Sequence, residues 1–131
     1  TLERTEATSG WGEVQRNASV MGVTMTMNGR RFHRGIGTHA PSRVSFDLPA
    51  GYATFCATIG YDQEVRGGSV VFVVEVDGEA RYRSPVVKWE SEPIEIVVPI
   101  TGAKRLSLVV EDAGDGVTAD HADWAEARLL R

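Results

Sequence analysis

The run from Ser69 to Asp77 constrains the fold of this chain more than any other segment. It is almost continuously apolar and rich in β-branched residues, and it ends at the turn signal Asp77-Gly78. A strand with such a sequence is covered on both faces, because a half-exposed strand alternates apolar and polar residues. The sequence therefore predicts a central, fully buried strand.

Shorter segments of the same character occur on both sides of this run. Val23–Met27 is followed by Asn28-Gly29 and a second strand-like run, which is a strong hairpin signal because both turn positions favour positive φ. Arg43–Leu48 and Leu106–Val110 alternate with a period of two residues. Ile94–Ile100 also alternates, and its Pro99 favours an edge strand or a strand end. Eight to ten short strands without a confident helix predict an all-β fold of two packed antiparallel sheets.

Residues 119–130 give a less clear signal. Their alanine, glutamate, arginine and leucine content favours a helix by propensity. As a strand, the same segment would place Trp124, Glu126 and Arg128 on one face, with Ala125, Ala127 and Leu129 on the other. The residues alone lean toward the helix.

Net charge and the length of the apolar runs limit the kinds of partner expected for this chain. The net charge is −4 and the acidic residues are dispersed, so a nucleic-acid partner is not expected. No apolar run approaches the ~20 residues that a membrane-spanning helix requires. The opening Thr1-Leu2-Glu3-Arg4 lacks the pattern of a signal peptide, and a start at Thr1 suggests a mature fragment or an excised domain. The single cysteine, Cys56, lies among apolar residues and is expected to be an inert buried thiol.

Five motifs occur in order along the chain, and together they resemble the NPCBM domain, which is the family 51 carbohydrate-binding module. The motifs are Gly10-Trp11-Gly12, Arg34-Gly-Ile-Gly-Thr-His-Ala40, Gly60-Tyr-Asp62, Val76-Asp-Gly78 and Asp120-His-Ala-Asp-Trp124. The resemblance runs from about Gly10 to the end of the chain. The sequence departs from the family pattern in having Asn17 where an aspartate is common.

The resemblance implies a single domain, residues 1–131, with a jelly-roll β-sandwich of the galactose-binding-like type, so residues 119–130 are predicted to form a strand. It implies a monomeric, non-catalytic module attached to a secreted glycoside hydrolase, with a terminal sugar of the galactose type as its ligand. Calcium, as a structural ion, is the one cofactor that it implies. The alternative interpretation is a structural or protein-interaction β-sandwich that binds no sugar.

The candidate sugar-binding residues are mostly aromatic or imidazole side chains. Trp11 and Trp124 could stack on the C–H face of a pyranose, although core packing is an equal or better explanation for each. Trp89 lies in a variable polar stretch and is a third candidate for stacking on the sugar ring. Asp120 and His121, with His39, could bind hydroxyl groups or could form a buried polar network, and Arg34 could bind sugar oxygens or form a surface ion pair.

Two oxygen-rich loops are weak candidates for calcium. One contains Asp62 and Glu64, and the other contains Asp115 between two glycines. Aspartates that stabilise turns are the alternative explanation for both loops.

Paired carboxylates also raise the question of a glycosidase, which requires two carboxyl groups ~5–9.5 Å apart on the two sides of a cleft. Asp120 and Asp123 would point to opposite faces of a strand, which prevents this arrangement. The sequence therefore favours a binding module over an enzyme.

Overall fold

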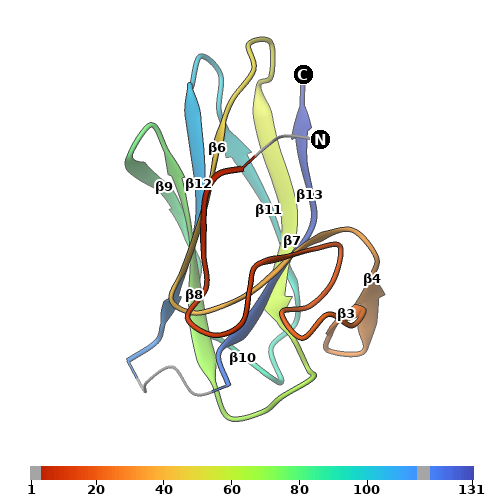
Figure 1. Ribbon diagram of the computed structural model, residues 1–131. Coiled ribbons are helices and arrows are strands. Elements are labelled where there is room, and N and C mark those ends of the chain that lie inside the picture. Colours follow the sequence, from red (N-terminus) through yellow and green to blue (C-terminus); the bar gives the residue numbers. More distant parts are fainter. Residues whose placement is uncertain (1–3, 115–118) are drawn as a thin grey trace.

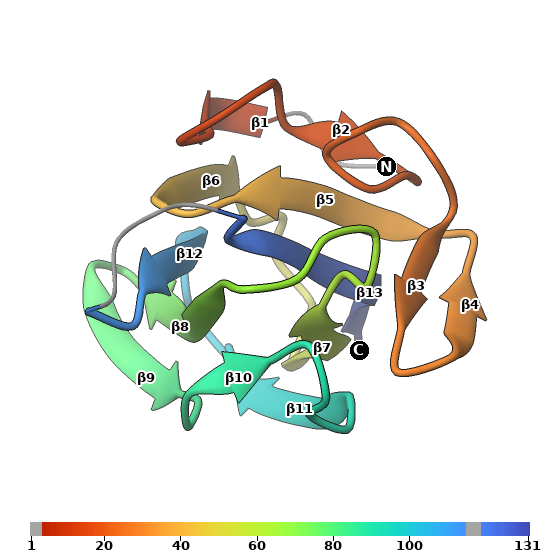
Figure 2. The ribbon, with the colours of Figure 1, turned by 90° about the horizontal axis from the view of Figure 1, so that it is seen from below.

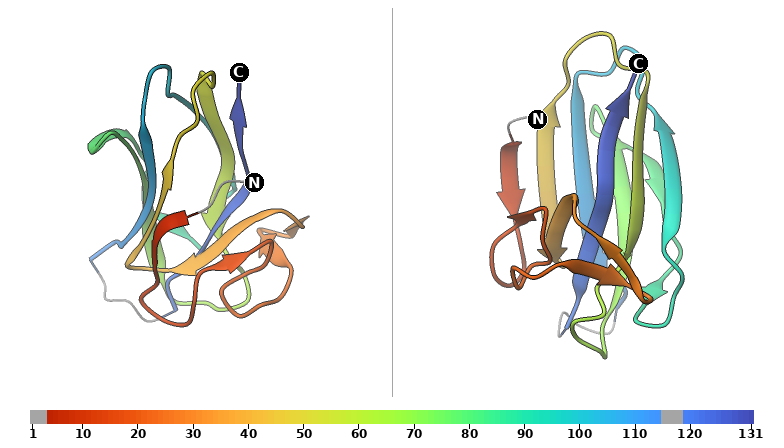
Figure 3. Two further views of the ribbon diagram at one scale, coloured as in Figure 1. Left: turned by 45° about the horizontal axis from the view of Figure 1, so that its top comes forward. Right: turned by 90° about the vertical axis from the view of Figure 1, so that its right-hand side faces the viewer.

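The computed structural model describes residues 4–114 and 119–131, which form two antiparallel sheets packed face to face (Figure 1; Figure 3). The first sheet has the spatial order β1 (Arg4–Thr8), β6 (Ser42–Asp47), β12 (Arg105–Asp112), β8 (Ser69–Val76) and β10 (Val87–Lys88), and β9 (Glu79–Arg83) also pairs with β8. The second sheet has the order β11 (Ile94–Pro99), β7 (Thr54–Tyr61), β13 (His121–Leu130), β5 (Gly35–His39) and β2 (Gln15–Arg16). The all-β sandwich predicted from the sequence is confirmed.

Several local predictions also agree with the structure. The apolar run is strand β8, which pairs with β12 and β9 and is buried along nearly its whole length. Asn28 and Gly29 form the turn of a hairpin between β3 (Met25–Met27) and β4 (Arg30–Phe32), with φ angles of 47° and 83°. Pro99 ends β11, which is an edge strand of the second sheet. Cys56 is a buried free thiol.

The C-terminal segment forms strand β13 rather than a helix, but its faces are not those predicted from simple alternation. Glu126 has a φ of 52°, and the register with β7 shifts between Ala125 and Arg128, which is a β-bulge. The extra residue reverses the alternation, so Trp124 before the bulge and Ala127 and Leu129 after it all pack toward the core. The prediction that Trp124, Glu126 and Arg128 share a face was therefore wrong.

The outer face of the second sheet is covered by a loop and by the β3–β4 hairpin, and glycines make room for both. A Cβ atom on Gly37 would lie 2.1 Å from the Ala18 carbonyl oxygen, and one on Gly60 would lie 2.4 Å from Met27 Sδ. Met25, Met27 and Phe32 form a small second core with Ala125 of β13. The hairpin therefore buries that face of the sheet under its two methionines.

The main core lies between the two sheets. Trp124 of β13 is fully buried, and its ring meets that of Phe72 of β8 edge to face, with centroids 5.0 Å apart. This contact joins interior strands of the two sheets. No helix long and apolar enough to cross a membrane is present in the described ranges.

Replacement of Trp124 by alanine is expected to cost ~3–5 kcal/mol of unfolding free energy, because it leaves a large cavity between the sheets. Urea denaturation would measure this loss. Trp124→Phe keeps the aromatic contact with Phe72 and should cost much less, whereas Val97→Ala, at a side chain that is 69% exposed, should change little. An unchanged urea midpoint for Trp124→Ala would contradict the assignment of this residue to the core.

Candidate functional site

Three loops and the start of β13 meet at one end of the sandwich, which Figure 2 shows from below. The loops contain residues 9–24, 40–41 and 62–68. Their hydrogen bonds and ring contacts bring together five side chains, which we call the histidine cluster: Trp11, Ser19, His39, Glu64 and His121. Three of the five were predicted as sugar-binding residues.

The two histidines of the cluster are neighbours because β5 and β13 pair in a fixed register. His39 is the last residue of β5 and lies opposite His121, the first residue of β13. Their ring centroids are 5.1 Å apart, at an interplanar angle of 64°. The Trp11 ring stacks on His121 with a centroid distance of 5.7 Å and an angle of 25°. An exposed indole therefore stands beside two imidazoles.

Hydrogen bonds fix the orientation of both imidazole rings. His39 Nδ1 lies 2.7 Å from the Ala40 carbonyl oxygen, which only accepts, so Nδ1 carries the proton and donates. His121 Nδ1 lies 2.6 Å from Glu64 Oε2, and the Ser19 hydroxyl donates to Glu64 Oε1 at 2.6 Å. Neither Nε2 atom has a hydrogen-bond partner within residues 4–114 and 119–131. Both histidines are only 5% exposed, so a ligand could reach Nε2 only through the small open part of each ring.

The charge of His39 follows from its surroundings. Burial lowers the pKa of His39, the hydrogen bond to the Ala40 carbonyl opposes this effect, and the nearby His121 lowers the pKa further. His39 is therefore neutral near pH 7, with Nε2 as a hydrogen-bond acceptor.

The Trp11 loop is attached to the end of β5 through its backbone. Gly10 N donates to the His39 carbonyl at 2.9 Å, and the Ser9 hydroxyl donates to the Trp11 carbonyl at 2.8 Å. A Cβ atom on Gly10 would lie 2.2 Å from the Ala40 carbonyl oxygen, so this close approach requires glycine. The side chain of Trp11 stays 53% exposed although its backbone is held on both sides.

This arrangement suits a small neutral ligand that is polar at its edges and apolar on one face. The indole offers an apolar surface, while the imidazole nitrogens offer directional hydrogen bonds. A pyranose has both properties. Asp120 and Asp123 are both fully buried and have separate partners, since Asp120 Oδ1 accepts a hydrogen bond from Ser69 N whereas Asp123 lies beside Asp62.

Three other predicted residues lie away from the histidine cluster or are buried. Trp124 has no exposed surface. Asp120 is also fully buried, and its Oδ1 accepts a hydrogen bond from Ser69 N at 2.9 Å, so it joins β13 to β8. Arg34 precedes β5 while His39 ends it, which separates them by ~16 Å at ~3.3 Å per residue.

Trp89 lies on the segment between β10 and β11, and its ring is already covered. The Arg66 guanidinium lies 3.9 Å from the ring centroid, and the indole Nε1 donates to the Gln63 carbonyl at 3.1 Å. A sugar could stack on that face only if Arg66 moved. Trp11 is therefore the better platform.

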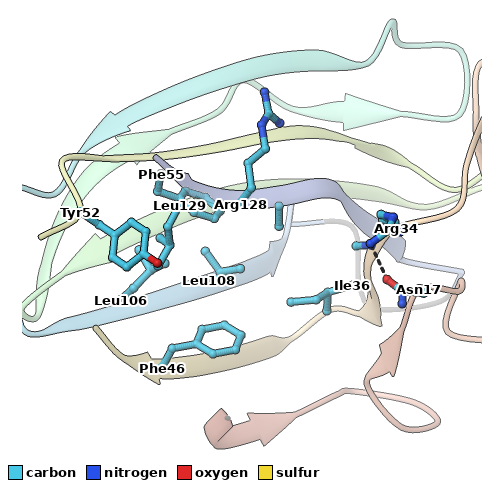
Figure 4. A pocket seen from close by; sticks show the side chains of 12 residues that line it. Asn17, Arg34, Ile36, Phe46, Tyr52, Phe55, Leu106, Leu108, Arg128 and Leu129 are labelled. Carbon is cyan, nitrogen blue, oxygen red and sulfur yellow. Dashed lines mark hydrogen bonds between the residues drawn. The ribbon is translucent and has the colours of Figure 1, made fainter. Parts of the chain in front are cut away.

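Arg34 borders a second concavity, which opens between the two sheets along β5, β6, β12 and β13 (Figure 4). The crevice holds about 370 Å³. Its walls are apolar core side chains, among them Phe46, Leu108 and Leu129, and Arg34 and Arg128 lie at its rim. A wall of aliphatic side chains offers few hydrogen bonds to hydroxyl groups, so the crevice does not resemble a sugar site.

The described candidates for calcium do not fit that ion. Asp62 accepts hydrogen bonds from the backbone amides of Thr26 and Glu64, at 3.2 and 3.0 Å, and the Glu64 carboxylate is engaged by Ser19 and His121. No group of three or more potential metal-ligating side chains occurs in the part of the chain that the structure describes. Asp115, the third candidate, lies outside the described residues.

Asp62 instead lies beside a second buried carboxyl group, that of Asp123. Burial raises the pKa of Asp123 well above its usual value, and the neighbouring carboxylates of Asp62 and Glu64 raise it further. When protonated, Asp123 donates a hydrogen bond to Asp62; when ionised, its two oxygens have no donor among the described residues. Asp123 is therefore stable as a neutral acid below the β3–β4 hairpin.

Sequence reasoning missed two members of the histidine cluster. Ser19 had no motif to mark it, and Glu64 was assigned to a cation rather than to His121. The long-range contacts that define their roles join residues 45 and 57 positions apart. Only the folded chain shows such contacts.

Comparison with known proteins decides the family. The model of the NPCBM/NEW2 domain matches residues 1–130. The chain belongs to the NPCBM/NEW2 family. It is an all-β, non-catalytic carbohydrate-binding module of the kind found in glycoside hydrolases.

Solved structures of CBM51 modules share the fold of this NPCBM domain closely. The CBM51 module of a Clostridium perfringens GH95 protein, solved in complex with methyl-galactose, is 36% identical, with a TM-score of 0.92. The match covers 98% of this chain and 95% of that chain. The structure of CBM51-2 with GlcNAc and INT domains from C. perfringens ZmpB is 33% identical, with a TM-score of 0.91, over 98% of this chain and 30% of that one.

Two relatives are much longer proteins with enzyme names. A protein of Renibacterium salmoninarum named as an endo-alpha-N-acetylgalactosaminidase is 33% identical over 93% of this chain. The alpha-1,3-galactosidase B of Akkermansia muciniphila is 28% identical over 88% of this chain. The chain spans only 8% and 15% of these two proteins, respectively.

The raised pKa of Asp123 predicts that part of the stability of the domain is lost as pH rises. The unfolded aspartate has a pKa of ~3.9, so the stabilising contribution is complete below that pH and declines up to the higher pKa of the folded state. Asp123→Asn keeps the shape and a donor to Asp62 but does not titrate. The difference in unfolding free energy between wild type and Asp123→Asn should therefore turn against wild type as pH rises from 4 to 8.

Urea denaturation at several pH values would measure this difference. The exposed carboxylate of Asp47 provides the control, because Asp47→Asn removes an acid without affecting the buried pair. Parallel pH profiles for wild type and Asp123→Asn would show that Asp123 is ionised in the folded protein.

Proposed function

We propose that this domain binds a terminal sugar of the galactose type at the histidine cluster and thereby keeps an attached catalytic domain near its glycan substrate. The observation that carries the proposal is the exposed indole of Trp11 beside two imidazoles whose Nδ1 atoms are held by protein acceptors. The sugar ring would lie against Trp11, and its hydroxyl groups would bond to Nε2 of His39 and His121.

The choice of galactose rests on chemistry and on similar proteins. In galactopyranose the axial 4-hydroxyl leaves several C–H groups together on one face, which favours stacking on an aromatic ring. The module with methyl-galactose bound is 36% identical to this chain over nearly the full length of both. A relative named for alpha-1,3-galactosidase activity supports the same class of sugar.

The role of the domain follows from the size of its relatives. A module that forms 8% or 15% of an enzyme-sized chain adds binding to a reaction performed elsewhere in that chain. Binding of the glycan raises the effective concentration of substrate at the catalytic domain without new chemistry. Such enzymes meet glycans outside the cell, so we propose that the protein is secreted.

Trp11→Ala is expected to weaken binding of methyl galactoside at least tenfold, which corresponds to ~1.4 kcal/mol. The melting temperature should stay close to that of wild type, because the Trp11 side chain is 53% exposed. Isothermal titration calorimetry or NMR titration would measure the affinity.

Trp89→Ala is the matched control for the competing platform, and it should leave sugar binding largely intact. Loss of binding in Trp89→Ala but not in Trp11→Ala would show that the sugar binds at Trp89 instead. A glycan array on the isolated domain tests the wider claim. Absence of binding to every glycan at millimolar concentration would favour the alternative, a structural or protein-interaction β-sandwich.

A further inference from the structure

The guanidinium of Arg66 is held on the face of an indole. Its central carbon lies 3.9 Å from the centroid of the Trp89 ring, the shortest of three such arginine–aromatic contacts among the described residues. Tryptophan attracts a cation more strongly than the other aromatic side chains do. This contact therefore restricts a long side chain that would otherwise sample many rotamers.

The indole under Arg66 is itself fixed in place. Trp89 Nε1 donates to the Gln63 carbonyl at 3.1 Å, and the half-buried ring packs against the main core between the two sheets. The surface on which the guanidinium rests is consequently part of the rigid sandwich.

The backbone is also held on both sides of Arg66. Val65, just before it, packs against the main core. Gly68, two residues after it, donates its backbone N–H to the Tyr61 hydroxyl at 3.0 Å, and a Cβ atom there would lie 2.5 Å from the Ala119 carbonyl oxygen. Both the backbone and the side chain of Arg66 are thus positioned by the surrounding fold.

The hydrogen-bond donors of Arg66 have no protein acceptor. The residue is exposed, and its guanidinium takes part in no ion pair or hydrogen bond within residues 4–114 and 119–131. Two exposed acids, Glu90 and Glu92, follow Trp89 on the same segment, yet neither pairs with Arg66. A guanidinium stacked on a ring keeps its N–H groups at its edge, where a planar anion can meet two of them.

Arg66 and the histidine cluster share one loop, residues 62–68. Glu64 Oε2 lies 2.6 Å from His121 Nδ1, and Arg66 follows Glu64 by two residues. The Cα atoms of Glu64 and Arg66 are therefore at most ~7 Å apart. A substituted sugar at the cluster could extend along this loop to the guanidinium.

We propose that Arg66, held on Trp89, is an anion subsite that binds a carboxylate or sulfate group of the glycan whose galactose-type sugar occupies the histidine cluster. The inference rests on the proposed function and adds acidic glycans to its ligands. The guanidinium fork matches the paired oxygens of a carboxylate, and a sulfate offers oxygens of the same kind.

The test is an NMR titration with five probes: methyl galactoside, and its derivatives that carry a sulfate or a sialic acid at position 3 or position 6. Wild type should bind at least one acidic derivative about fivefold more tightly than methyl galactoside, which is the upper range for one exposed ion pair. The preference should disappear as the salt concentration rises from about 0.01 to about 1 M. Comparison of the sulfated with the sialylated derivatives shows which source of the anion is recognised.

The indole N–H resonances report where each part of the ligand binds. The Trp89 resonance should shift with the preferred acidic derivative but not with methyl galactoside, because only the former reaches Arg66. The Trp11 resonance should shift with both probes.

A matched pair of variants tests the role of Arg66. Arg66→Gln should lose the preference while its affinity for methyl galactoside stays within about twofold of wild type, and it should fold normally because the side chain is exposed. Arg131→Gln removes the same charge from an arginine over the Tyr52 ring, 4.7 Å from its centroid, and should keep the preference. Tyr52 precedes β7, whose other end leads into the loop 62–68, so this control lies at the opposite end of the strand.

The proposal would be overturned if wild type bound no acidic derivative more tightly than methyl galactoside, or if the preference survived in Arg66→Gln. Failure of the proposed function gives a different result, in which methyl galactoside does not bind and the Trp11 resonance does not shift.

Discussion

Strand β13 pairs with both β5 and β7, and this pairing positions the core and the loop end of the sandwich. Its register places His121 opposite His39 on one side, and the same strand inserts Trp124 between the sheets. A slip of one residue would turn Trp124 toward the hairpin and move His121 away from Glu64. One set of backbone hydrogen bonds therefore fixes both the core and the histidine cluster.

The two faces of β13 pack against different parts of the protein. This explains why the motif Asp120-His-Ala-Asp-Trp124 mixes apolar and acidic residues. The inner face carries Ala122 and Trp124 into the main core. The outer face carries Asp123 and Ala125 under the β3–β4 hairpin, where the neutral acid meets Asp62. Asp62 in turn accepts the backbone amide of Glu64, so the buried acid pair supports the loop that orients His121.

Two glycines allow the loops to pack closely against the second sheet. Gly10 and Gly37 are glycines because another segment's backbone oxygen lies where a Cβ atom would be. These close approaches hold the Trp11 loop on the end of β5 and the Asn17–Ser19 segment on the outer face of the sheet. An exposed aromatic residue binds a ligand at a lower entropic cost when its backbone is held in place, and backbone contacts hold the Trp11 loop in this way.

Alternation, turn chemistry and ordered motifs are local properties, so they were enough to predict the fold class, the central strand, the Asn28-Gly29 turn and the family. It identified Trp11, His39 and His121 as candidates, but it gave Trp124 and Arg34 equal standing. The folded chain was needed to separate these candidates, because burial and distance depend on strand register and on one bulge at Glu126. Ser19 and Glu64 entered the site for the same physical reason: their partners are distant in sequence and adjacent only after folding.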